Sequence, residues 1–91
     1  MGLAYTSKNK IWHNGLQQDN TRKYNYYVAV FAYNEVLYAD SKWYAWPILW
    51  PKNKVLPLKS YESAVGVSEE VGDYVIQHNL SWQIEIQWEP K

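Results

Sequence analysis

Residues 82–89 read WQIEIQWE and alternate without exception between large apolar and polar side chains. Successive side chains of a β-strand point to opposite faces, so this segment has one fully apolar face and one fully polar face. Such a pattern is typical of an antiparallel strand whose apolar face lies on a core and whose other face meets solvent. We therefore expect four of its side chains in the core: Trp82, Ile84, Ile86 and Trp88.

The preceding region, residues 60–79, has a helical period instead. Ser60 can cap a short helix that ends at Gly66, and Ser68 can cap a second one. Glu69 and Glu70 would then lie at the N-terminal end of the second helix, where the helix dipole favours negative charge. The side chains that repeat at helical spacing are Val71, Tyr74, Val75 and His78.

Further strands are predicted in the first half of the chain. Residues 24–33 are rich in β-branched and aromatic side chains on both faces, which predicts a central strand covered on both sides. Residues 36–40 can return as its hairpin partner. Residues 43–50 contain Pro47, which has no N–H for a sheet, so that strand lies at an edge or is broken there. An Asn-Gly turn predicts a hairpin within residues 11–18.

These elements together predict an α+β fold. We expect a small antiparallel sheet of four to five strands packed against a short helical segment at residues 60–79. A length of 91 residues fits one domain, residues 1–91, because domains span about 50 to 250 residues. The valines expected in the core beside the last strand are Val28, Val30, Val71 and Val75.

The composition excludes several kinds of chemistry. The chain has no cysteine and only two histidines, and neither histidine belongs to a catalytic or metal-binding motif. Glu85 and Glu89 share one strand face, which is better explained as a solvated sheet surface than as a catalytic pair. We therefore expect no catalytic residue, no metal site and no cofactor. No apolar run is long enough for a membrane span and no signal-like start is present, so we expect a cytoplasmic protein.

The excess of aromatic residues is the main indication of function. Nine tyrosines and six tryptophans are more large rings than a chain of this size easily buries, and such rings are enriched in protein interfaces. We predict a non-enzymatic protein-binding module that occludes its partner, as inhibitors and adaptors of phage or mobile elements do. The expected contact surface comprises Trp43, Tyr44, Trp46, Trp50, Lys52 and Lys54, with Glu69 and Glu70 as a second candidate.

Two alternatives stay open. The same rings and lysines could bind single-stranded nucleic acid, although zero net charge and a single arginine count against it. Self-association is also conceivable because charge is unevenly distributed. Residues 1–59 hold eight of the nine basic residues, and residues 60–91 hold six of the nine acidic ones. The two halves could complement each other within one chain or between two chains.

Overall fold

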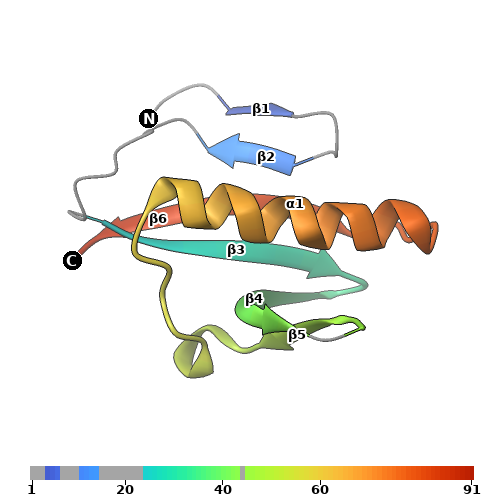
Figure 1. Ribbon diagram of the computed structural model, residues 1–91, viewed down its shortest axis with the longest axis horizontal. Coiled ribbons are helices and arrows are strands. Elements are labelled where there is room, and N and C mark those ends of the chain that lie inside the picture. Colours follow the sequence, from blue (N-terminus) through green and yellow to red (C-terminus); the bar gives the residue numbers. More distant parts are fainter. Residues whose placement is uncertain (1–3, 7–10, 15–23, 44) are drawn as a thin grey trace.

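The computed structural model describes residues 4–6, 11–14, 24–43 and 45–91, and it has a sheet of six strands with one α-helix across it (Figure 1). In chain order the elements are β1 (Ala4–Thr6), β2 (Ile11–Asn14), β3 (Tyr24–Ala32), β4 (Glu35–Trp43), β5 (Pro47–Trp50), the 3-10 turn η1 (Lys52–Lys54), α1 (Tyr61–Gln77) and β6 (Gln83–Pro90). The strand order across the sheet is β1-β2-β6-β3-β4-β5. The predicted α+β fold is confirmed.

The centre of the sheet is antiparallel, and its edges differ from the prediction. β6, β3, β4 and β5 are antiparallel neighbours, whereas β2 pairs with β6 in parallel. The antiparallel partner of β2 is β1, a strand that was not predicted. Residues 15–18, the expected second half of a hairpin, lie outside the described residues. The parallel pairing of β2 with β6 was not predicted, because these strands lie near opposite ends of the sequence.

The helical region forms one helix rather than two. The Ser60 hydroxyl accepts a hydrogen bond from the Ser63 N–H at 3.1 Å and caps the N-terminus as predicted. No break follows at Gly66, and Ser68 is buried inside the helix, where its hydroxyl donates to the Val65 carbonyl at 2.8 Å. The buried stripe runs through both halves, at Ala64, Val67, Ser68, Val71, Gly72 and Val75. Its packing outweighs the roughly 1 kcal/mol that a glycine costs a helix.

The helix ends in a Schellman motif. Asn79 adopts a positive φ of 53°, which asparagine tolerates better than most residues. The Leu80 N–H donates to the Val75 carbonyl at 2.9 Å and the Asn79 N–H donates to the Ile76 carbonyl at 3.2 Å. These bonds satisfy the last carbonyls and redirect the chain into β6. No helix in the described part of the chain is long and apolar enough to cross a membrane.

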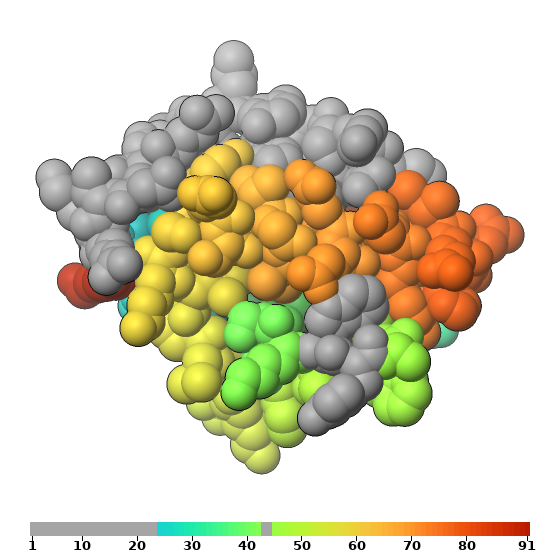
Figure 2. Space-filling model, in the orientation of Figure 1, coloured from blue at the N-terminus to red at the C-terminus, as the bar shows by residue number. Residues whose placement is uncertain are grey.

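The core lies between α1 and one face of the sheet, and Figure 2 views the molecule from the helix side. All four predicted valines are buried there, together with Tyr26, Ile84 and Ile86. Trp82 and Trp88 are half-buried and pack against this core, as the alternation predicts. The indole N–H of Trp82 is buried and finds no acceptor among the described residues.

The expectations for residues 24–33 and 43–50 need correction. β3 is central, but α1 covers only one of its faces. Residues 43–50 do not form one strand, because the β4–β5 register shifts between Ala39 and Trp43 and the chain bends before β5 begins at Pro47. β5 is an edge strand, which suits a residue without an N–H. Beyond η1 the chain returns to β3, where Leu58 and Tyr26 exchange backbone hydrogen bonds at 2.8 and 2.9 Å.

Gly66 offers a test of the single helix. It is exposed, and a Cβ added there would meet nothing within 4 Å beyond its chain neighbours and the adjacent turns of its own helix backbone. We expect Gly66→Ala to raise the free energy of unfolding by about 0.5–1 kcal/mol, because alanine favours a helix interior. Urea unfolding followed by circular dichroism measures the change. Two separate helices with a break at Gly66 would instead lose stability on this substitution.

Candidate functional site

The sheet face opposite α1 is covered by none of the described elements, and we call it the open face. The alternation of the strands places on it Tyr27, Ala29 and Phe31 of β3; Val36, Tyr38 and Asp40 of β4; Ile48 and Trp50 of β5; and Gln83, Glu85, Gln87 and Glu89 of β6, with Lys52 of η1 reaching over it.

Four aromatic side chains lie on the open face: Tyr27, Phe31, Tyr38 and Trp50. The rings of Tyr27 and Tyr38 meet edge to face with centroids 5.9 Å apart. The indole N–H of Trp50 donates to Oδ2 of Asp40 at 2.9 Å, which fixes the ring. Phe31 and Trp50 remain 37% and 39% exposed. Ala29 is fully buried although α1 lies on the other face of the sheet.

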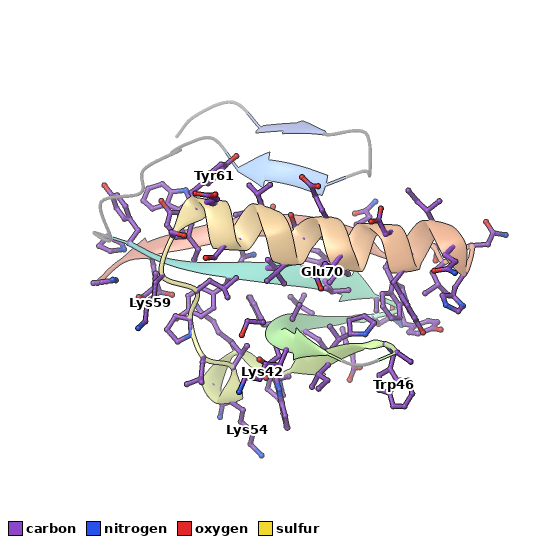
Figure 3. All side chains as sticks on the ribbon, in the orientation of Figure 1. Lys42, Trp46, Lys54, Lys59, Tyr61 and Glu70 are labelled. Carbon is purple, nitrogen blue, oxygen red and sulfur yellow. The ribbon has the colours of Figure 1, made fainter. Side chains whose placement is uncertain are left out.

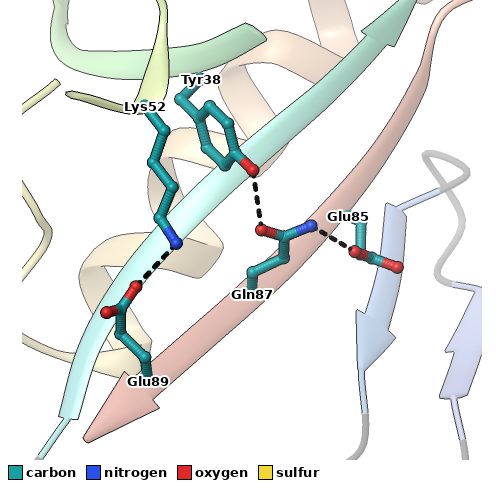
Figure 4. Close-up of polar contacts among 5 residues, drawn as sticks. All are labelled: Tyr38, Lys52, Glu85, Gln87 and Glu89. Carbon is teal, nitrogen blue, oxygen red and sulfur yellow. Dashed lines mark hydrogen bonds and ion pairs between the residues drawn. The ribbon is translucent and has the colours of Figure 1, made fainter. Parts of the chain in front are cut away.

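A chain of polar contacts runs beside the rings (Figure 4). The Tyr38 hydroxyl donates to Oε1 of Gln87 at 3.1 Å, and Nε2 of Gln87 donates to Oε1 of Glu85 at 2.7 Å. Lys52 Nζ lies 2.8 Å from Glu89 and 5.0 Å from the centroid of the Tyr27 ring. The polar face of β6, expected to be merely solvated, is therefore an ordered row of acceptors and donors.

The neighbours of Lys52 on this face change its proton affinity. Its hydrogen bond with Glu89 raises the pKa of the ammonium above its usual value of 10.5, and the charges of Glu89, Tyr38 and Tyr27 add to the effect. Desolvation acts in the opposite direction and is outweighed. The cation is thus held by a carboxylate and an aromatic ring together, two kinds of group that attract positive charge.

The predicted contact surface from Trp43 to Lys54 does not form one patch. Trp50 and Lys52 lie on the open face. Trp46 is 59% exposed at the bend between β4 and β5, and Figure 3 shows it and Lys54 at opposite ends of this edge of the molecule. The backbone of Trp43 ends β4, while its side chain and Tyr44 lie outside the described part of the structure.

Glu69 and Glu70 do not lie at a helix start, which corrects the prediction. They are exposed in the middle of α1, because the helix continues through Gly66. Glu70 lines a groove of about 470 Å³ between α1 and the segment that follows η1, with Leu56 and Lys59. The sheet separates this groove from the open face, so the acidic pair and Trp50 belong to different surfaces.

Most of the open face was not predicted from the sequence. Tyr27 and Phe31 were predicted in a strand covered on both sides, and Tyr38 in its hairpin partner. Glu85 and Gln87 were predicted on the solvated face of the last strand. The sequence did show which side chains share a face within each strand. The polar residues of β6 occupy every second position, and so do the residues on the second apolar face of β3. Their meeting could not be predicted, since nothing local indicates that β3 pairs with β6.

Among the described residues, no three His, Cys, Asp or Glu side chains lie close enough to hold a metal ion. Comparisons with protein-family models, curated proteins and solved structures found no match.

The raised pKa of Lys52 can be measured directly. We expect Glu89→Gln to lower this pKa toward 10.5, because the hydrogen bond and charge that favour the ammonium are lost. Nuclear magnetic resonance (NMR) of the Lys52 side chain across an alkaline pH titration reports it. Because the folded-state pKa is the higher one, the contribution to stability is fully present below pH 10.5 and is lost as the pH rises through the raised pKa. Glu69→Gln is the matched control and should leave the Lys52 pKa unchanged.

Proposed function

We propose that this chain is a non-enzymatic protein-binding module whose contact surface is the open face. The observation that carries the proposal is the group of four aromatic side chains on this face, Tyr27, Phe31, Tyr38 and Trp50. Tyr27 and Tyr38 contact each other, Trp50 is held by Asp40, and Phe31 and Trp50 are exposed. A few side chains carry most of the binding energy in protein interfaces, and tryptophan and tyrosine are enriched among them. Fixing their orientation before binding lowers the entropic cost of association. In this proposal the module acts by occluding the surface of its partner, as an inhibitor or adaptor does.

The charge of the open face indicates what kind of protein would bind. Among the residues that define this face, Asp40, Glu85 and Glu89 carry negative charge and only Lys52 carries positive charge. Lys52 is already paired with Glu89. A partner with a basic surface would therefore be attracted, whereas an acidic one would be repelled.

The same charge balance argues against single-stranded nucleic acid as the partner. Proteins of that class combine stacking rings with a positively charged groove that follows the phosphates. Here the rings are accompanied by carboxylates, which would repel phosphates, so protein binding is the better-supported proposal. Titration with oligonucleotides at two salt concentrations distinguishes the two, since binding to phosphates weakens steeply as salt rises.

A capture experiment with matched variants tests the proposed surface. We expect Phe31→Gln combined with Trp50→Gln to weaken retention of the partner from a lysate of the source organism by at least tenfold, because two exposed rings are lost. Quantitative mass spectrometry of the retained proteins measures the loss. Circular dichroism must show that the variant still folds.

Two controls locate the surface. Trp46→Gln removes a more exposed ring at the β4–β5 bend, and Ile76→Gln removes an exposed apolar side chain of α1. Both variants should retain the same protein as the unmodified chain. Equal retention by the open-face variant, or loss through either control, would reject the open face as the contact surface.

A further inference from the structure

The open face already binds one cation within the chain. Lys52 reaches from η1 to place its ammonium 5.0 Å from the centroid of the Tyr27 ring and 2.8 Å from a carboxylate oxygen of Glu89. Tyr27 lies on β3 and Glu89 on β6, so the two groups come from neighbouring strands. The pair shows how this surface holds a positive charge, with a ring on one strand and a carboxylate on the next.

The register of β3 and β6 repeats this pair four residues further along. Tyr27 pairs directly with Gln87, so Glu89 stands diagonally, two residues further along β6. Phe31 pairs directly with Gln83, and Glu85 stands at the same diagonal, again two residues further along β6. Side chains at such diagonal positions are within reach of each other when they are aromatic or long. The sheet thus presents the ring–carboxylate pair twice on one face.

The second pair borders a cavity. A space of about 190 Å³ is lined by Phe31, Gln83, Ile84 and Glu85. Oε1 of Glu85 accepts the Gln87 amide at 2.7 Å, which orients the carboxylate, and a carboxylate can accept several hydrogen bonds. We call the Tyr27–Glu89 pair the first position and the Phe31–Glu85 pair the second. The ion pair found among the described residues, Lys52 with Glu89, lies at the first position.

We propose that the Phe31–Glu85 pair is a binding site for a lysine or arginine side chain of a basic, extended segment of the partner protein. This inference rests on the proposed function, and it specifies the chemistry that the open face recognises. Lys52 is the intramolecular counterpart of the bound cation: it fills the first position, and the partner fills the second. Ring–cation attraction and the carboxylate charge act together at both positions.

The spacing of the two positions gives a distinctive prediction. Four residues of an extended strand span about 13 Å. A peptide with lysines four residues apart, such as acetyl-KSSSK-amide, can therefore place its cations at both positions at once, provided that Lys52 is removed. Lys52→Met retains an apolar side chain beside Tyr27 but vacates the first position.

NMR titrations of the backbone amides with two probe peptides test the site. The probes are acetyl-KSSSK-amide and acetyl-QSSSK-amide, which has a single lysine. For the unmodified chain we expect both peptides to shift the amides of Phe31, Gln83 and Glu85, with similar affinity. Glu85→Gln should weaken both by about three- to tenfold, because a charge-assisted contact is lost. Lys52→Met should strengthen binding of the two-lysine peptide several-fold relative to the single-lysine peptide.

Controls separate this inference from the proposed function. Glu69→Gln makes the same change of charge on α1 and should leave both affinities unchanged. The cation site is overturned if the shifts lie elsewhere, if Glu85→Gln binds like the unmodified chain, or if Lys52→Met does not favour the two-lysine peptide. In that case, capture of a partner that depends on Phe31 and Trp50 still upholds the proposed function. An oligonucleotide that shifts these amides when the peptides do not would overturn both.

Discussion

β3 and β6 pair over eight residues in the centre of the sheet, from Tyr24 opposite Pro90 to Phe31 opposite Gln83. The rest of the structure depends on this pairing. On one face it sets valines of β3 beside isoleucines of β6, and these form the floor of the core beneath α1. On the other face it sets aromatic rings beside amides and carboxylates. One register therefore determines both the packing that stabilises the fold and the composition of the open face.

The aromatic excess divides between the two sides of this sheet. On the helix side the rings of Tyr24, Tyr26, Tyr61 and Trp88 contact one another edge to face around the start of α1. Near the other end of the helix, the Tyr74 ring contacts the rings of His78 and Trp82 at tilted angles. On the open face the rings of Tyr38 and Trp50 are instead tied to polar neighbours. A single helix cannot cover both faces of a six-stranded sheet, so aromatic side chains complete the second layer themselves and remain partly exposed.

Much of the fold could be predicted because its signals are local. The strict alternation of residues 82–89, the helical period of residues 60–79 and the cap at Ser60 each depend on a few neighbouring residues. The errors arose where packing overrode local preference. Gly66 did not break the helix because the buried stripe continues through it. Glu69 and Glu70 consequently moved from a helix start to its middle. Of the predicted contact residues whose side chains the structure describes, Trp50 and Lys52 are brought together on the open face.

The sequence by itself determined which side chains share a face of each strand, since alternation follows from backbone geometry with a period of two residues. It therefore placed Glu85 with Glu89, and Tyr27 with Phe31, in separate sets. Only the tertiary structure decided that these two sets are neighbours and in what register. Strand pairing joins distant segments through backbone N–H and C=O groups, which are the same for nearly every residue type. The diagonal pairs Tyr27–Glu89 and Phe31–Glu85, and the position of Lys52 at the first of them, therefore follow from the tertiary structure alone.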